Sequence, residues 1–141
     1  MANIIYVDDR DNTITYSPSN GWELGGVNRE YDNTTHGSIL VGTPMEISFA
    51  FQGTRVMVYG TIAPAKDNNI IPPVSYYKVD NTPAVTYTAP AIQNTQYHQQ
   101  FYDSGNLADG VHTVIINPLT TQNSTLWFDY YTYLPSSGLF K

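Results

Sequence analysis

Hydrophobic and polar residues alternate along many short stretches of this chain, and clusters of Gly, Pro, Asn, Asp and Ser separate these stretches. In residues 46–51 every second position is a large hydrophobic residue, and in residues 55–59 the alternation places Val56 and Val58 on one face. No window of about a dozen residues carries a helical hydrophobic stripe without a Gly or Pro interruption. The chain is therefore expected to fold as an all-β sandwich or barrel of short strands.

The turns expected between strands are rich in Gly, Pro, Asn and Asp, and one of them falls at Gln52 and Gly53. The longest irregular stretch, 64–73, is predicted to be a surface loop. A chain of 141 residues suits a single domain, 1–141, in which residues 136–141 form a loose tail. The remaining expected strands are 4–7, 14–16, 38–41, 75–79, 84–88, 97–102, 111–116 and 126–133.

Charged residues make up only 13% of the chain, and the six Lys and Arg residues stand singly against twelve Asp and Glu residues. A net charge of −6 without a basic cluster argues against nucleic acid and anionic membrane surfaces as partners. No apolar run approaches the roughly 20 residues of a membrane-spanning helix, so membrane insertion is not expected. The N-terminal residues lack the pattern of a signal peptide, which predicts a cytoplasmic protein. The absence of Cys excludes disulfides and thiolate metal sites.

A series of short motifs follows in a set order along the chain. They are Val7-Asp8-Asp9, Ile14-Thr15-Tyr16-Ser17, Gly21-Trp22, Thr35-His36-Gly37-Ser38, Phe49-Ala50-Phe51-Gln52-Gly53-Thr54, Val58-Tyr59-Gly60-Thr61-Ile62, Tyr77-Lys78-Val79-Asp80, Tyr87-Thr88-Ala89-Pro90, Phe101-Tyr102, Asp109-Gly110-Val111-His112-Thr113 and Phe128-Asp129-Tyr130. Over roughly positions 4 to 135, this order resembles a module common in mushroom-forming fungi, usually the secreted part of membrane-anchored proteins. The resemblance implies a two-sheet antiparallel β-sandwich of the jelly-roll, galactose-binding-domain-like type.

Without the leader and anchor usual for that module, the chain is similar to the small defence lectins of mushroom fruiting bodies. These include lectins that bind mucin and recognise fucosylated glycans as homodimers. The resemblance implies a non-catalytic lectin for terminal fucose- or galactose-containing glycans of glycoproteins and mucins, with a role in fungal defence. Two alternatives stay open: a structural or adhesive protein-interaction module without sugar binding, and, ranked lower, a small glycan hydrolase.

Sugar recognition combines an aromatic face, which stacks on the C–H surface of a sugar ring, with amides, carboxylates or imidazoles that bind neighbouring hydroxyls. Such side chains gather in three loop regions, and loops at the same end of a sandwich bring their side chains together. The alternative for Trp22, weighted equally, is an ordinary loop residue that covers the core. The candidate carbohydrate-binding residues are Trp22, Arg29, Tyr31, Asn33, His36, Gln93, Asn94, Tyr97, His98 and Asn123.

The chain holds twelve Tyr residues, some of them adjacent, as at Tyr76-Tyr77 and Tyr130-Tyr131. Neighbours on a strand face opposite ways, so one Tyr of each pair is expected to be exposed or to lie against another chain. Together with the low charge, this surplus predicts a homodimer in which two subunits share one sugar pocket.

Asp8, Asp9 and Asp11 near the first strand and Asp129 in the last could supply oxygen ligands to a structural calcium ion. No Asp-x-Asp-x-Asp-Gly loop is present, and capping of a turn by Asp8 or Asp9 is the preferred interpretation, so no cofactor is expected. His112 alternates with hydrophobic residues and is expected to be a packed, hydrogen-bonded histidine. The three His residues lack metal-binding spacing, and no catalytic motif is present, which favours a protein that is not an enzyme.

Overall fold

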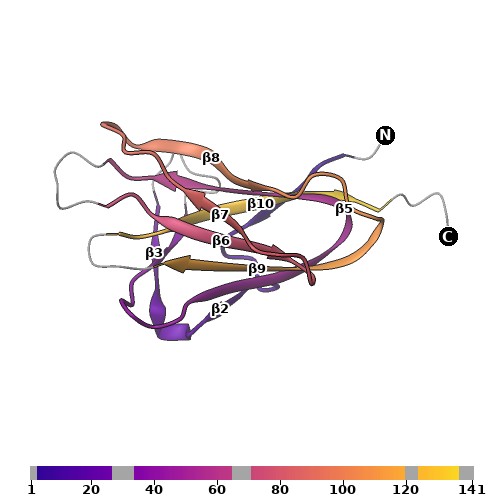
Figure 1. Ribbon diagram of the computed structural model, residues 1–141, viewed down its shortest axis with the longest axis horizontal. Coiled ribbons are helices and arrows are strands. Elements are labelled where there is room, and N and C mark those ends of the chain that lie inside the picture. Colours follow the sequence, from indigo (N-terminus) through magenta and orange to yellow (C-terminus); the bar gives the residue numbers. More distant parts are fainter. Residues whose placement is uncertain (1–2, 27–33, 65–70, 120–123, 137–141) are drawn as a thin grey trace.

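The computed structural model of this chain describes residues 3–26, 34–64, 71–119 and 124–136 (Figure 1). The regular structure there is almost entirely strand, apart from the short 3₁₀ turn η1 (Ser19–Gly21). The expected all-β class is therefore confirmed. The strands are β1 (Ile5–Asp8), β2 (Thr15–Ser17), β3 (Trp22–Gly25), β4 (Thr35–Ser38), β5 (Glu46–Ile62), β6 (Val74–Val79), β7 (Val85–Thr88), β8 (Gln96–Asp103), β9 (Gly110–Leu119) and β10 (Trp127–Pro135).

Strand β5 belongs to both layers of the sandwich, and it curves round at the right of Figure 1. Its first half pairs with β2 and β9, and β9 continues through β6 to β7. Its second half pairs with β8 and β10, and β10 also pairs with β1 and β4, beyond which lies β3. Every pairing between the described strands is antiparallel, and the sheet curls into two layers through β5, so the predicted antiparallel β-sandwich is confirmed. No helix in the described ranges has the length and apolar character required to cross a membrane.

The prediction of a turn at Gln52 and Gly53 is wrong, because β5 continues through both residues. Gly53 lies opposite Gly110 of β9 and opposite Pro135 of β10, at the point where β5 leaves one layer for the other. A Cβ atom at Gly53 would lie 1.9 Å from the carbonyl oxygen of Leu134. Glycine therefore allows the close backbone approach at this bend, and its presence marks a bent strand instead of a hairpin.

The strand expected at 38–41 is also displaced, because β4 ends at Ser38. Ile39 and Val41 alternate as a strand would, yet they are 43% and 58% exposed. The pairing of β4 with β10, and not the position of these two hydrophobic residues, determines where the strand lies. Strand β3 was not expected from the pattern either. The other predicted strands overlap observed ones and differ from them only at their ends.

Aromatic rings from the two layers stack across the core. The rings of Phe49 on β5 and Tyr131 on β10 have centroids 3.7 Å apart, and those of Tyr77 on β6 and Tyr102 on β8 are 5.1 Å apart. Tyr77 is fully buried, and its hydroxyl is 2.8 Å from the Ser75 hydroxyl. A buried tyrosine needs such a partner, which explains why polar-tipped rings are tolerated in this core.

The expected exposure of one residue in the Tyr130-Tyr131 pair is wrong, since both side chains are buried within one chain, 5% and 2% exposed. Tyr131 points into the core, and Tyr130 points to the outer face of the second layer. There, other rings cover Tyr130: its centroid is 4.8 Å from that of Tyr59 and 5.7 Å from that of Tyr6. An outward position on a strand is therefore covered by neighbouring strands of the same sheet, without a partner chain.

Candidate functional site

A shallow pocket of about 170 Å³ opens on the outer face of the second layer, near the end of β5. Two aromatic side chains line it, Tyr97 from β8 and Trp127 from β10, and both are half-buried. The rest of the lining is small and includes Gly25, Thr35, Thr61, Ala63 and Thr95. The pocket thus combines two flat rings with small neighbours that leave space above them.

The alternation of β10 places Trp127 on this outer face. Its neighbours Leu126 and Phe128 are buried in the core, 2% and 1% exposed, so Trp127 points the other way. A Cβ atom at Gly37 would lie 2.4 Å from Cζ3 of the indole, and one at Gly25 would lie 2.9 Å from the same atom. These two glycines therefore make room for the indole to lie directly against β3 and β4.

The chemistry of the pocket is aromatic and hydroxylic. The lining residues that the structure describes include Thr and Tyr hydroxyls but no charged side chain. Aromatic faces bind C–H surfaces, and hydroxyl groups both donate and accept hydrogen bonds. This arrangement suits a neutral ligand that has one apolar face and several hydroxyl groups.

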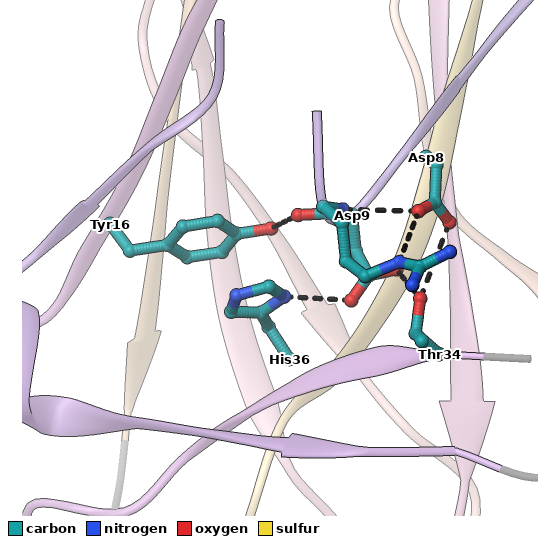
Figure 2. A network of polar contacts seen from close by, with 6 residues as sticks. Asp8, Asp9, Tyr16, Thr34 and His36 are labelled. Carbon is teal, nitrogen blue, oxygen red and sulfur yellow. Dashed lines mark hydrogen bonds and ion pairs between the residues drawn. The ribbon is translucent and has the colours of Figure 1, made fainter. Parts of the chain in front are cut away.

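A polar network lies on the other side of β4, centred on Asp9 (Figure 2). The Asp9 side chain is completely buried. The Thr34 hydroxyl donates to Asp9 Oδ1 at 2.5 Å, and Nδ1 of His36 lies 2.7 Å from Asp9 Oδ2 and donates to it. The Tyr16 hydroxyl donates to the Asp9 carbonyl oxygen at 2.5 Å, and its ring stacks on that of His36 with centroids 3.9 Å apart. The network joins the end of β1 to β2 and β4.

The electrostatics of this network follow from burial beside like charge. Burial raises the pKa of Asp8 above its usual value, and the neighbouring Asp9 carboxylate raises it further, while hydrogen bonds from Arg10 act in the opposite direction. Burial, with the charges of Asp9 and Asp8, also raises the pKa of Tyr16 well above its usual range. Tyr16 is therefore a neutral hydrogen-bond donor at any physiological pH.

The structure brings three of the four acidic candidates for calcium together. Carboxylate oxygens of Asp8, Asp9 and Asp129 lie within 4.8 Å of one another, whereas the Asp11 carboxylate accepts hydrogen bonds from Thr13 instead. Calcium requires six to eight oxygen ligands. Both carboxylate oxygens of Asp9 already accept hydrogen bonds from side chains on or beside β4. The three carboxylates supply only part of that set, and calcium binding at this point stays a prediction.

Of the sequence-derived candidates that lie within the described ranges, only Tyr97 lines the pocket. Trp22 lies elsewhere: its ring packs edge-on against Tyr16 with centroids 5.3 Å apart, and its Nε1 is 3.4 Å from the Ser17 carbonyl oxygen. His36 faces the core side of β4 within the Asp9 network.

The other candidates divide into exposed residues and residues that lie outside the described ranges. Gln93 and Asn94 are exposed in the loop before β8. His98 is exposed, has a left-handed backbone conformation with φ 54°, and places Nδ1 3.3 Å from the Tyr130 hydroxyl. The residues outside the described ranges are Arg29, Tyr31, Asn33 and Asn123.

Trp127 is the aromatic lining residue that was not predicted from sequence, and the small lining residues such as Thr35, Thr61 and Thr95 were not predicted either. The candidates predicted from sequence lie in loop regions, whereas this tryptophan lies at the first position of a strand. Its signal was nevertheless present, because the inward positions Leu126 and Phe128 on either side assign an outward-facing aromatic ring to position 127.

His112 is hydrogen-bonded on both ring nitrogens. Its Nδ1 is 2.6 Å from Asp80 Oδ2, and its Nε2 is 2.6 Å from the carbonyl oxygen of Ala108. The second Asp80 oxygen accepts a hydrogen bond from the backbone N–H of Thr113 at 2.8 Å. The hydrogen bond with Asp80 raises the pKa of His112, and the same bond lowers the pKa of Asp80. Because two acceptors face the two ring nitrogens, the geometry favours the imidazolium form.

The chain matches no protein-family model and no curated protein. Solved structures share its fold at low sequence identity. A family 35 carbohydrate-binding module from Clostridium thermocellum is 17% identical with a TM-score of 0.61, over 93% of this chain and 97% of that one. The CBM35 of Abf62 from Cellvibrio japonicus is 9% identical with a TM-score of 0.59, over 95% of each chain.

The same fold also occurs as part of larger enzymes. A family two carbohydrate esterase from Cellvibrio japonicus is 17% identical with a TM-score of 0.60, and 96% of this chain matches 35% of that one. This chain thus spans about a third of the esterase's length. At these identities, the likeness establishes the β-sandwich fold alone.

Proposed function

We propose that this protein is a non-catalytic carbohydrate-binding domain, which binds a sugar in the pocket lined by Trp127 and Tyr97. The observation that carries the proposal is the pair of half-buried rings in an uncharged, hydroxyl-containing lining. The fold supports it, since the solved structures that match over nearly their whole length include carbohydrate-binding modules.

In this proposal the sugar ring stacks through its C–H face on an aromatic side chain, and its hydroxyls bond with Thr95 and the Tyr97 hydroxyl. A pocket of about 170 Å³ is smaller than the ~300–1,000 Å³ of pockets for drug-sized ligands. A single terminal sugar therefore fits it better than an internal stretch of polysaccharide.

The finer assignments form part of the same proposal. Terminal fucose and galactose each present a continuous C–H patch on one face, which suits the aromatic lining. We propose glycoproteins and mucins as the carriers of these sugars, with a cytoplasmic fungal defence protein as the setting. We also propose a homodimer without a resident cofactor, because two subunits give the bivalence that raises the avidity of weak sugar sites.

The test replaces each ring in turn and measures binding to a glycan array, followed by calorimetry on the sugars retained. Trp127→Ala and Tyr97→Ala should each lower the affinity about tenfold or more, or roughly 1.4 kcal/mol, because the stacking face is removed. The matched control is Trp22→Phe, which changes a ring outside the pocket and should leave the affinity unchanged.

Three results would contradict the proposal. Absence of binding by the unaltered protein across the array would favour the adhesive alternative. Wild-type affinity in both Trp127→Ala and Tyr97→Ala would place the sugar elsewhere. Release of product from glycan substrates would favour the hydrolase.

A further inference from the structure

Strands β3 and β4 form one wall of the pocket, and few backbone pairs join this wall to the rest of the sandwich. In the described part of the chain, β3 pairs only with β4, and β4 joins the rest of its layer through two residue pairs with β10. These pairs are Gly37 with Trp127 and His36 with Phe128. Yet β3 and β4 supply Gly25 and Thr35 to the pocket. A ladder this short leaves the position of the wall dependent on other contacts.

One set of these contacts holds the end of β4 farther from the pocket. The Ser38 N–H donates to the Leu126 carbonyl oxygen at 3.1 Å, and the Leu126 N–H donates to the Ser38 hydroxyl at 3.0 Å. The N–H of Ile39 donates to the Gly21 carbonyl oxygen at 2.9 Å. These bonds anchor Ser38 and Ile39, three and four residues beyond Thr35.

Asp9 holds the end of β4 that is nearer to the pocket. Its two carboxylate oxygens bind Thr34 and His36 separately, at 2.5 and 2.7 Å. Thr35 stands between these two residues and, by the alternation of a strand, points to the opposite side, where it lines the pocket at 1% exposure. One carboxylate thus clamps the wall residue from both sides.

Asp9 is also tied to the strand that carries the indole. Its backbone N–H donates to the carbonyl oxygen of Asp129 at 3.0 Å, two residues beyond Trp127. The pairing of β10 with β5 shifts register between Phe128 and Tyr130, so the strand is irregular at this point. Through its backbone and its side chain, Asp9 connects β10 to β4.

We propose that Asp9 is a positioning residue for the sugar pocket: it sets the position of the β3–β4 wall against Trp127 without touching the ligand. This inference rests on the proposed function. The carboxylate is needed because it accepts two hydrogen bonds on separate oxygens. An amide of the same size accepts only one of them and presents a donor to the other partner.

The first test reads the pocket without any sugar. In a Trp22→Phe background, Trp127 is the only tryptophan, and acrylamide quenching of its fluorescence reports how well the wall covers it. Asp9→Asn and Thr34→Val should each raise the quenching constant at temperatures where the protein is folded. Asp80→Asn, which disrupts the other Asp–His pair, is the matched control and should leave the quenching unchanged. Thr34→Val removes only the Thr34 hydroxyl, which donates to Asp9 at 2.5 Å and lies 3.5 Å from Asp8 Oδ1, so this variant tests the inference if Asp9→Asn fails to fold.

The second test measures the affinity for L-fucose and D-galactose in the same variants. Asp9→Asn should weaken binding about tenfold, with a smaller loss in Thr34→Val and none in Asp80→Asn. Unchanged quenching and affinity in the Asp9 and Thr34 variants would overturn the inference, as would equal changes in Asp80→Asn. Failure of the parent to bind either sugar would count against the proposed function alone, because the quenching still reports whether Asp9 positions Trp127.

Discussion

Two Asp–His pairs with nearly the same contact distance lie in different parts of this sandwich, one between the end of β1 and β4 and the other between the end of β6 and β9. In both, His Nδ1 meets Asp Oδ2, at 2.7 Å for His36 and Asp9 and at 2.6 Å for His112 and Asp80. The Asp9 side chain is completely buried, whereas the Asp80 side chain is 41% exposed. The two histidines are similarly covered, with side chains 15% exposed for His36 and 12% for His112, so the pairs differ in the exposure of their aspartates.

The difference shows that the surroundings determine what such a pair does. Water can replace the partner of Asp80, so its pair with His112 contributes little beyond orienting the turn after β6. The Asp9 carboxylate is itself completely buried, and its removal leaves the partly buried Thr34 and His36 without their acceptor. The buried pair is structural and sets the pocket wall, and the exposed pair responds to pH.

Removal of the buried carboxylate should have the largest effect. We expect Asp9→Ala to lower the free energy of unfolding by about 3 kcal/mol, because a buried hydrogen-bonded pair loses one member. Asp80→Ala should lower it by less than about 1 kcal/mol. Urea denaturation of both variants measures the difference. Equal losses in the two variants would remove the distinction between the pairs.

A methyl group placed beside the pocket should have the next largest effect. Gly37→Ala puts a Cβ atom 2.4 Å from Cζ3 of Trp127, and the rigid indole must move. We expect a loss of about 2 kcal/mol from overpacking, together with a shift of the Trp127 emission maximum. Gly110→Ala, near His112, is the control, since no atom lies within 4 Å of its new Cβ and its stability should change by under about 0.5 kcal/mol. If Gly37→Ala left the free energy of unfolding and the Trp127 emission maximum unchanged, the β3–β4 wall would have to move away from the indole at little cost.

The smallest effect is the pH dependence of the exposed pair. Because the pKa of His112 is raised on folding, its contribution to stability is complete below the ordinary value of 6.5 and is lost as the pH rises through the raised value. The lowered pKa of Asp80 makes its contribution complete above 3.8 and lost at more acidic pH. The unfolding free energies of wild type and His112→Gln should therefore differ by about 0.5 kcal/mol near pH 5 and converge well above the raised pKa. A difference that grows with pH would contradict this sign.

The fold class follows from sequence because alternation is a local property with a direct structural meaning. The strands around Phe49, Val114 and Tyr131 carry their buried faces in the pattern itself. The bend at Gly53 cannot be predicted from the local pattern, since glycine occurs both in turns and in bent strands. The distinction depends on the partners Gly110 and Pro135, which are distant in sequence.

The pocket was harder to predict than the fold, for a related reason. Tyr97 came from loop composition, but Trp127 faces the same cavity from a strand that begins thirty positions later. The clamp on the wall depends on contacts between Asp9 and His36, which pairing and not sequence spacing brings together. The residue types in the sequence indicate which kinds of side chain are available for binding. Only the order of the strands in the sheet shows which of these side chains lie together.

The continuity of β5 has a consequence for which changes in length the chain tolerates. Side chains along a strand alternate between its two faces, so inserting or deleting a single residue before Gly53 would shift the first half of β5 relative to β9 and turn its hydrophobic side chains toward solvent. The second half of β5 is paired with β8 and β10, so either these pairings would also shift or the strand would be distorted near Gly53. Libraries of single-codon insertions should therefore be depleted throughout positions 46–62.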